Sequence, residues 1–156
     1  MGPLISESAA ISVKEKIDEA IGQGAECILG GDLLTDLGPN FFQPTILRNV
    51  HPSSRIWSTE TFGPVVAITT FLREEEAIDL ANDSNFGLAS YFCSKDMARV
   101  FRVSERLENG IVGINEGIIS TATAPFGGVK ESGFGREGSS AGIAEYLETK
   151  YIFLNY

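Results

Sequence analysis

The sequence predicts an α/β fold: a mostly parallel sheet flanked by helices. Apolar runs rich in β-branched residues alternate along the chain with segments whose apolar residues recur every three or four positions. This alternation is typical of architectures in which helices cover a sheet. The chain has 156 residues, of which 43% are hydrophobic and 21% charged, enough for one domain with a real core.

The first predicted helix covers residues 7–22. Its apolar side chains recur at helical spacing, and we expect these to face inward: Ala10, Val13, Ile17, Ala20 and Ile21. Gly22, the last residue of this range, and Gly24 are expected to end the helix. Further helices are predicted at residues 72–84 and 95–110, together with a short one at 143–150.

The strands are predicted from short β-branched and apolar runs, at residues 26–31, 41–50, 65–71, 87–94, 111–115 and, at the end of the chain, about 150–156. Pro44 favours an edge or the start of a strand. The run at 65–71 is nearly continuous in apolar residues, so we expect that strand to be covered on both faces.

Composition argues against several kinds of partner. The net charge is −9, with 21 acidic residues against 12 basic ones, whereas nucleic acids and anionic membrane surfaces call for a basic face. No apolar run approaches the roughly 20 residues of a membrane span, and no signal-peptide pattern opens the chain.

The two cysteines and the single histidine are the residues considered first for metal binding or redox chemistry. Cys27, Cys93 and His51 show no metal-ligand or CxxC spacing, so no metal site is predicted. Both cysteines lie in apolar runs and are expected to be buried thiols, whereas His51 is expected in a loop. A reducing compartment follows, namely the cytoplasm or, in a eukaryote, the mitochondrial matrix.

The stretch "TETFGPVV" at residues 59–66 places one carboxylate, Glu60, at the entrance of a strand. A carboxylate accepts two hydrogen bonds side by side, which fits the adjacent hydroxyls of a ribose, and Phe62 offers a flat face to a planar ring. Gly63 permits a close backbone approach, and Pro64 fixes the turn. A structural role for Glu60, capping a neighbouring backbone, is equally compatible with the residues.

Residues 116–142 form a long loop rich in glycine, serine and threonine, and a loop of this length is usually functional or disordered. Ser120 follows a strand end and could donate to an oxyanion or a carboxylate, or be an ordinary loop serine. Glu116 is either an acid–base group or, as we favour, a solvated loop charge. "GFGREG" at 133–138 matches G-x-G-x-x-G, but no apolar strand precedes it, so a dinucleotide fingerprint is rejected.

Several motifs occur together and in order: "FFQPTIL", "ETFGP", "NFGLAS", "GIVGIN", "PFGGVKESGFGREG" and "YLETKYIFL". On these motifs the chain resembles the C-terminal part of the aldehyde dehydrogenase superfamily over nearly its whole length. "GINEGIIS" followed by "APFGGVKESG" is most similar to the NAD(P)-dependent succinate-semialdehyde dehydrogenase branch.

The resemblance implies residue roles. Glu60 would bind the nicotinamide ribose of NAD or NADP, and Phe62 would pack at the nicotinamide end. Ser120 would help to hold the distal carboxylate of the substrate, and Phe126 would line the aldehyde tunnel. The last strand, at about 150–156, would pair with a neighbouring subunit in a homo-oligomer.

The departures from the family pattern are also informative. The family's nucleophilic cysteine, general-base glutamate, oxyanion asparagine and Rossmann domain have no match here, so no catalytic residue is assigned. Ser12 stands where relatives often carry a lysine for the adenosine ribose. We therefore expect residues 1–156 to be the C-terminal third of such an enzyme, inactive alone. The alternative is a non-catalytic truncated product that associates with itself or with full-length subunits.

Overall fold

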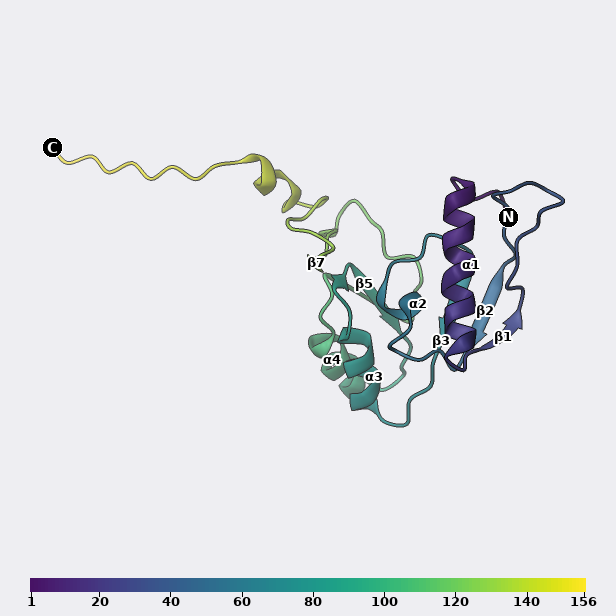
Figure 1. The fold of residues 1–156 in the computed structure, drawn as a ribbon. Helices are drawn as coiled ribbons and strands as arrows, with labels where there is room; N and C mark the ends of the chain where they lie inside the picture. Colours follow the sequence, from purple (N-terminus) through teal and green to yellow (C-terminus); the bar gives the residue numbers. More distant parts are fainter. The chain divides into compact units, whose positions relative to one another are not determined.

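The protein is described by a computed structural model that covers residues 1–156. The chain forms two compact units, Met1–Leu72 and Arg73–Tyr156. Figure 1 shows their elements in chain order, from the purple helix α1 to the yellow C-terminal segment.

The first unit begins with α1, Glu7–Gly22. The Ser6 hydroxyl caps the helix by accepting a hydrogen bond from the Ala9 amide at 3.1 Å. Gly24 follows the helix with φ of +104°, a left-handed conformation that suits glycine at a helix end. The predicted bounds are thus confirmed, but the prediction that Ile21 faces inward is wrong, because its side chain is 41% exposed.

A three-stranded sheet follows, in the order β1 (Glu26–Leu29), β2 (Thr45–Arg48), β3 (Val65–Ile68). β1 is antiparallel to β2, and β2 is parallel to β3 with Thr45 opposite Val65. Pro44 immediately precedes β2, as expected of a strand start. The short helix α2, Arg55–Ser58, lies in the connection between the two parallel strands.

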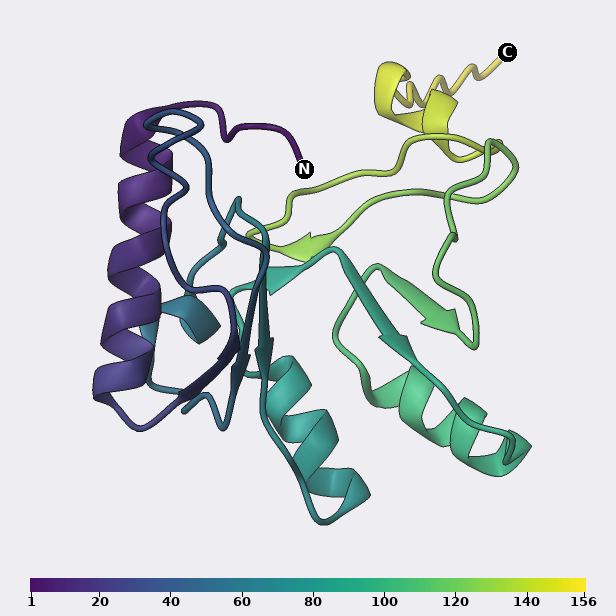
Figure 2. The same ribbon diagram turned by 90° about the vertical axis from the view of Figure 1, so that its right-hand side faces the viewer.

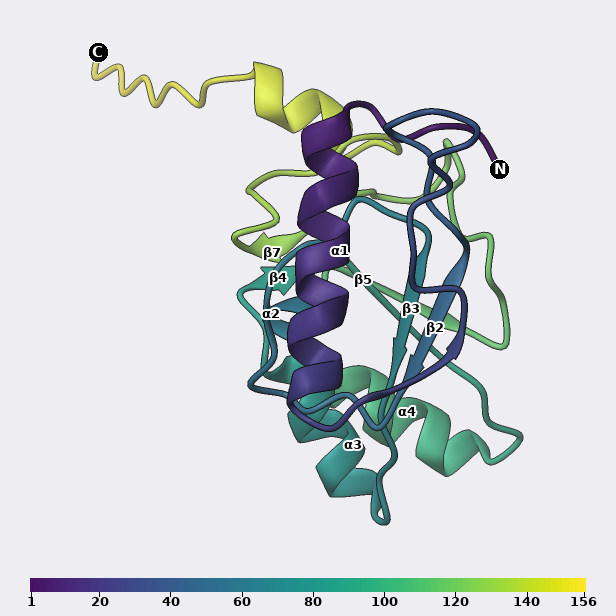
Figure 3. The ribbon, with the colours of Figure 1, turned by 45° about the vertical axis from the view of Figure 1, so that its right-hand side comes forward.

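The core of the first unit lies between α1 and this sheet, and Figure 3 shows the helix running alongside β2 and β3. Nine buried side chains form it: Ala10, Val13, Ile17, Ala20, Ala25, Phe42, Leu47, Val50 and Ile56. The helical members recur every three or four residues, so the predicted apolar stripe of α1 is the face that packs.

The second unit starts with α3 (Glu74–Asn82), β4 (Phe86–Gly87), β5 (Ala89–Phe92) and α4 (Met97–Arg106). It continues through β6 (Ile111–Ile114), β7 (Val129–Lys130) and a 3-10 helix, Gly142–Tyr146. β5 pairs in parallel with β6, and β4 pairs antiparallel with β7 (Figure 2). The chain is therefore α/β as predicted, but its sheets are small and mixed rather than mostly parallel.

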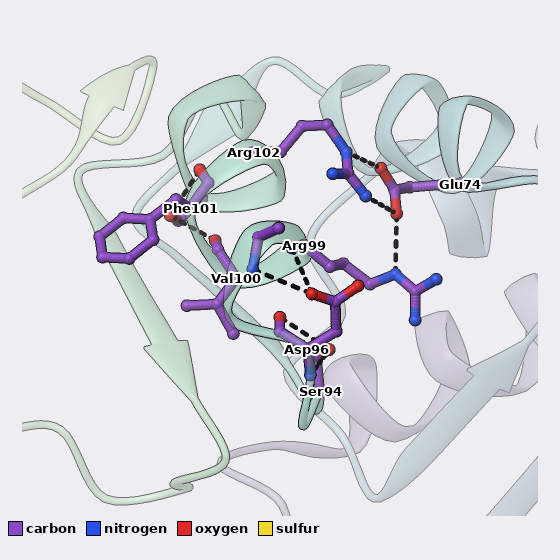
Figure 4. Close-up of polar contacts among 9 residues, drawn as sticks. Glu74, Ser94, Asp96, Arg99, Val100, Phe101 and Arg102 are labelled. Atoms are coloured by element: carbon purple, nitrogen blue, oxygen red, sulfur yellow. Dashed lines mark hydrogen bonds and ion pairs between the residues drawn. The ribbon is translucent and has the colours of Figure 1, made fainter.

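An acid between two arginines joins α3 to α4 (Figure 4). Glu74 accepts from Arg102 Nε at 2.6 Å and from Arg99 Nε at 2.9 Å. These hydrogen bonds, led by that from Arg102, lower the pKa of Glu74 from 4.5 to about 2. Asp96 caps the start of α4 by accepting from the amide of Ala98 at 2.9 Å.

Two predictions about burial are wrong, and they share a cause. β3 alternates between partly buried and exposed residues, so it is covered on one face only, and Val66 on the open face is 55% exposed. Cys27 and Cys93 are both exposed. Both predictions assumed that other elements cover both faces of each sheet. Within each unit, fewer covering elements are present.

The C-terminal end also differs from expectation. The short helix predicted at 143–150 is a 3-10 helix at Gly142–Tyr146. Residues 147–156 form neither helix nor strand, and all are exposed. Pairing of this segment with a second subunit stays a prediction, because a strand needs a hydrogen-bonded neighbour to form.

Candidate functional site

Glu60 lies in the segment that joins α2 to β3, and its side chain is exposed. Its carboxylate makes no hydrogen bond or ion pair with the chain, which removes the support for the capping role left open above. Phe62, two residues on, is 78% exposed. A carboxylate with both oxygens available and an open aromatic face therefore stand close together on one segment.

Helix α1 holds this segment from the other side. Lys16 donates to the backbone carbonyl of Glu60 at 2.7 Å and to the Thr61 hydroxyl at 3.2 Å. A Cβ added to Gly63 would lie 2.7 Å from Val13 Cγ2. Gly63 thus permits a close approach of the segment to α1. The carbonyl of Pro64 accepts from the Thr45 amide at 2.8 Å and starts the pairing of β3 with β2.

Lys16 was missed from the sequence. It lies 44 residues before Glu60, and nothing in the spacing of either residue predicts the contact. In the sequence Lys16 is one of several charged residues of α1, with no feature that distinguishes it. Only the packing of α1 against the segment reveals the role.

Glu116 follows β6 and is exposed. Its carboxylate accepts from the amides of Gly117 at 2.8 Å and Ile118 at 3.0 Å. The bond from Ile118, followed by that from Gly117, lowers the pKa of Glu116. Glu116 is therefore an ionised residue that shapes its loop, which fits the acid–base alternative poorly.

Asn115, at the end of β6, is a second residue that sequence reasoning missed. It adopts a φ of +55°, and its side chain bonds Ser94 twice, accepting from the amide at 2.9 Å and donating to the carbonyl at 2.8 Å. These bonds join the loop after β5 to the end of β6. An asparagine directly after an apolar strand, with the left-handed tolerance of its side chain, was the available signal.

Ser120 lies four residues beyond Glu116 and is exposed, and its hydroxyl makes no hydrogen bond with the chain. It is free to donate to a ligand. The structure places it on the same loop as Phe126.

Phe126 lines a hollow of about 780 Å³ within the second unit. Its backbone pairs with Glu137 through hydrogen bonds of 2.7 and 2.8 Å. Arg136 donates to the carbonyls of Gly128 at 2.8 Å and Gly135 at 2.7 Å, which fixes the wall of the hollow. Ser120 is not among the lining residues.

The remaining candidates carry no site. "GFGREG" at 133–138 forms a glycine-rich loop with positive φ at Gly133, Gly135 and Gly138. Only the 3-10 helix at Gly142–Tyr146 follows it, not the α-helix that a dinucleotide fingerprint requires. His51 lies in a loop, where its ring nitrogen bonds the hydroxyl of Ser53 at 2.8 Å. No group of three or more potential metal ligands is present. No helix is both long and apolar enough to cross a membrane.

Comparison with known proteins gives a consistent result. A profile of the aldehyde dehydrogenase family matches residues 1–152. The succinate-semialdehyde dehydrogenase of Escherichia coli K12, whose name specifies NADP(+), is 53% identical over 152 residues, 97% of this chain and 31% of that protein. The glutarate-semialdehyde dehydrogenase of Pseudomonas putida is 51% identical over 154 residues, 99% of this chain and 32% of that protein.

The fold agrees with a solved structure. The crystal structure of succinate-semialdehyde dehydrogenase from Burkholderia pseudomallei superposes with a TM-score of 0.88 at 51% identity. The match covers 94% of this chain and 30% of that chain. The present chain thus spans about a third of the length of the relatives it matches.

Proposed function

The chain belongs to the aldehyde dehydrogenase family, and we propose that it supplies cofactor and substrate residues of an NAD(P)-dependent semialdehyde dehydrogenase. The substrate class is a carboxylated aldehyde such as succinate semialdehyde, which is oxidised to the acid. The observation that carries this proposal is identity of about one half, over nearly the whole chain, to relatives named for succinate and glutarate semialdehyde.

Glu60 and Phe62 fit the nicotinamide end of the cofactor. The Glu60 carboxylate has no partner in the chain and can accept from both hydroxyls of a ribose, while the exposed ring of Phe62 can pack beside a planar base. When bound, NAD(P)+ supplies the hydride acceptor of the reaction. The contribution of these two residues is to orient the ribose and ring.

Ser120 and Phe126 would act on the substrate side. The unpaired hydroxyl of Ser120 can donate to the distal carboxylate of the aldehyde, and Phe126 adds an apolar wall. Both would act by placement of the substrate rather than by bond making.

We propose that the 156-residue chain is inactive alone. The thiol of Cys27 donates weakly to the carbonyls of Leu29 and Gly30, each at 3.4 Å, and neither cysteine lies in the family's nucleophile motif. Glu116, engaged by backbone amides, is a poor proton acceptor. Turnover of succinate semialdehyde with NAD(P)+ by the purified chain would contradict this proposal.

Cofactor binding can be tested on the chain itself with nicotinamide mononucleotide, which carries only the ring, ribose and phosphate. We expect amide shifts in 15N NMR spectra to centre on residues 60–65. Glu60→Gln removes the charge that strengthens the ribose bonds, so affinity should fall about tenfold. Glu15→Gln, an exposed glutamate on α1, is the matched control and should bind normally. Equal affinity of wild type and Glu60→Gln would reject Glu60 as the ribose ligand.

A second function, a subunit-association module, is favoured by one observation. The C-terminal residues are large, apolar and 68–108% exposed: Tyr151, Ile152, Phe153, Leu154 and Tyr156. Monomeric proteins rarely expose such an apolar run. Association with a second chain would remove these side chains from water. Light scattering after size-exclusion chromatography should show oligomers of the chain and loss of oligomers after deletion of residues 151–156. A soluble monomer at high concentration would count against association.

A further inference from the structure

We propose that Lys16 of α1 is a positioning residue for the Glu60 carboxylate, an inference that rests on the proposed cofactor role of Glu60. Lys16 would act by fixing the backbone from which Glu60 and Phe62 project. It makes no hydrogen bond or ion pair with the Glu60 carboxylate itself.

The contact is made to the backbone. The Lys16 ammonium donates to the carbonyl of Glu60 at 2.7 Å, and a second bond of 3.2 Å reaches the Thr61 hydroxyl. No acid lies within ion-pair distance of Lys16, so both bonds use the ammonium as a donor to neutral oxygens. Hydrogen bonds from a charged donor are stronger than those between neutral groups.

This contact fixes Thr61, the residue between the two proposed cofactor-binding side chains. Thr61 and Gly63 are partly buried, while Glu60 and Phe62 between and before them are exposed. The backbone turns at Phe62, where the Gly63 amide donates to the Thr61 carbonyl at 3.0 Å. With Thr61 held against α1, its two neighbours Glu60 and Phe62 remain exposed to solvent.

A second contact on α1 supports the first. Gly63 lies against Val13, which is 3% exposed and part of the core. Val13 and Lys16 are three residues apart and so share one face of the helix. The segment is thus held at Glu60 by a polar contact and at Gly63 by packing.

The helix contains its own control. Lys14 lies two residues before Lys16, but it pairs with Asp18 and, at 3.5 Å, with Asp32. It makes no hydrogen bond or ion pair with residues 59–64. Lys14→Met therefore removes a similar charge and a similar side chain from α1 without touching the segment.

The first measurement needs no ligand. In Lys16→Met the ammonium is lost and the aliphatic chain is kept, so the amides of Gly63 and Val65 should exchange about tenfold faster. Lys16→Arg, which keeps a charged donor, should restore slow exchange, and Lys14→Met should match wild type. Circular dichroism should show α1 intact in all three variants. Unchanged exchange in Lys16→Met would overturn the inference.

The second measurement links the segment to binding. Lys16→Met should bind nicotinamide mononucleotide about three- to tenfold more weakly than wild type, with rescue by Lys16→Arg. Faster exchange with unchanged affinity would also overturn the inference, since the carboxylate would then be placed without Lys16. Absence of binding by the wild-type chain would reject the proposed function, and exchange alone would then decide whether Lys16 fixes the segment.

Discussion

The two units of this chain are of similar length but are held together differently. Met1–Leu72 contains a cluster of nine buried hydrophobic side chains. Arg73–Tyr156 has only three buried hydrophobic side chains: Ile78, Val100 and Val103. The first unit therefore has a larger buried hydrophobic core than the second.

Polar side chains also bond to the backbone of the second unit and join its elements. Asn82 joins the end of α3 to the end of α4, donating to the carbonyl of Arg106 and accepting from the amide of Glu108. Lys130 of β7 donates to the carbonyls of Asn82 and Ser84. A polar network fixes geometry, but each bond contributes only about 0.5–1.5 kcal/mol net. The difference between the units indicates that polar contacts define the geometry of residues 73–156, whereas hydrophobic burial stabilises them less than it stabilises residues 1–72.

The largest expected effect is the loss of a core side chain in the first unit. Ile17 is fully buried, so Ile17→Ala should lower the free energy of unfolding by about 2–5 kcal/mol. Trp57, which packs against the core, reports the transition by its fluorescence. Ile11→Ala, at a side chain 44% exposed on the same helix, should cost about 1 kcal/mol or less. Equal losses in the two variants would break the contrast between core and surface.

The next effect tests the polar network of the second unit. Asn82→Ala removes two hydrogen bonds, of 2.8 and 2.9 Å, each contributing about 0.5–1.5 kcal/mol net, so we expect a loss of about 1–3 kcal/mol. Hydrogen exchange of the α4 amides measures it. Asp83→Ala, the neighbouring residue with an exposed side chain, should change little. If Asn82→Ala exchanges like wild type, the second unit is held by something other than this network.

A smaller effect is expected at the start of α1. Ser6→Ala removes the cap of the helix and should cost about 1 kcal/mol, less than the loss of Ile17. Ser12→Ala deletes the same hydroxyl from an exposed mid-helix position, and alanine there should be neutral or slightly stabilising. Urea unfolding followed at Trp57 gives both values. A cap effect as large as the core effect would show that α1 depends on local bonds.

The smallest effect is a dependence on pH. The pKa of Glu74 falls from 4.5 to about 2 in the folded chain, so its contribution is present above pH 4.5 and is lost as pH falls toward 2. The arginines are about half exposed, which limits the size of the effect. Glu74→Gln should flatten the acid limb of the stability profile, whereas Glu75→Gln should keep it. An unchanged acid limb in Glu74→Gln would show that the pair stabilises nothing.

The parts predictable from sequence are those whose signal is local. The apolar side chains of Ala10, Val13 and Ile17 recur at helical spacing, which predicts both the helix α1 and the face of it that is buried. The strand of residues 65–68 was also evident, but not that one of its faces stays open, because an apolar run carries no information about what covers it. The exposure of Cys27 was mispredicted for the same reason.

The candidate site residues also differ in whether the local sequence identifies them. Glu60 and Phe62 could be singled out because one charge and one aromatic precede an apolar strand. Ser120 could be named as a possible donor from its place after a strand, but its proposed substrate role, like that of Phe126, is implied only by the resemblance. Lys16 could not be found at all, because its contact depends on two segments far apart in sequence.

The open face of β3 has a consequence for how the chain behaves in solution. β1 and β3 are both edge strands, and Ile28, Val66 and Ile68 on them are 40–55% exposed. Unpaired edges with apolar side chains promote sheet-to-sheet association, and the net charge of −9 opposes it by repulsion between copies. Salt shortens the range of that repulsion from about 30 Å at 0.01 M to about 3 Å at 1 M. The colloidal stability of this chain is therefore set by ionic strength, and dilute buffer above its isoelectric point is the condition that keeps it dispersed.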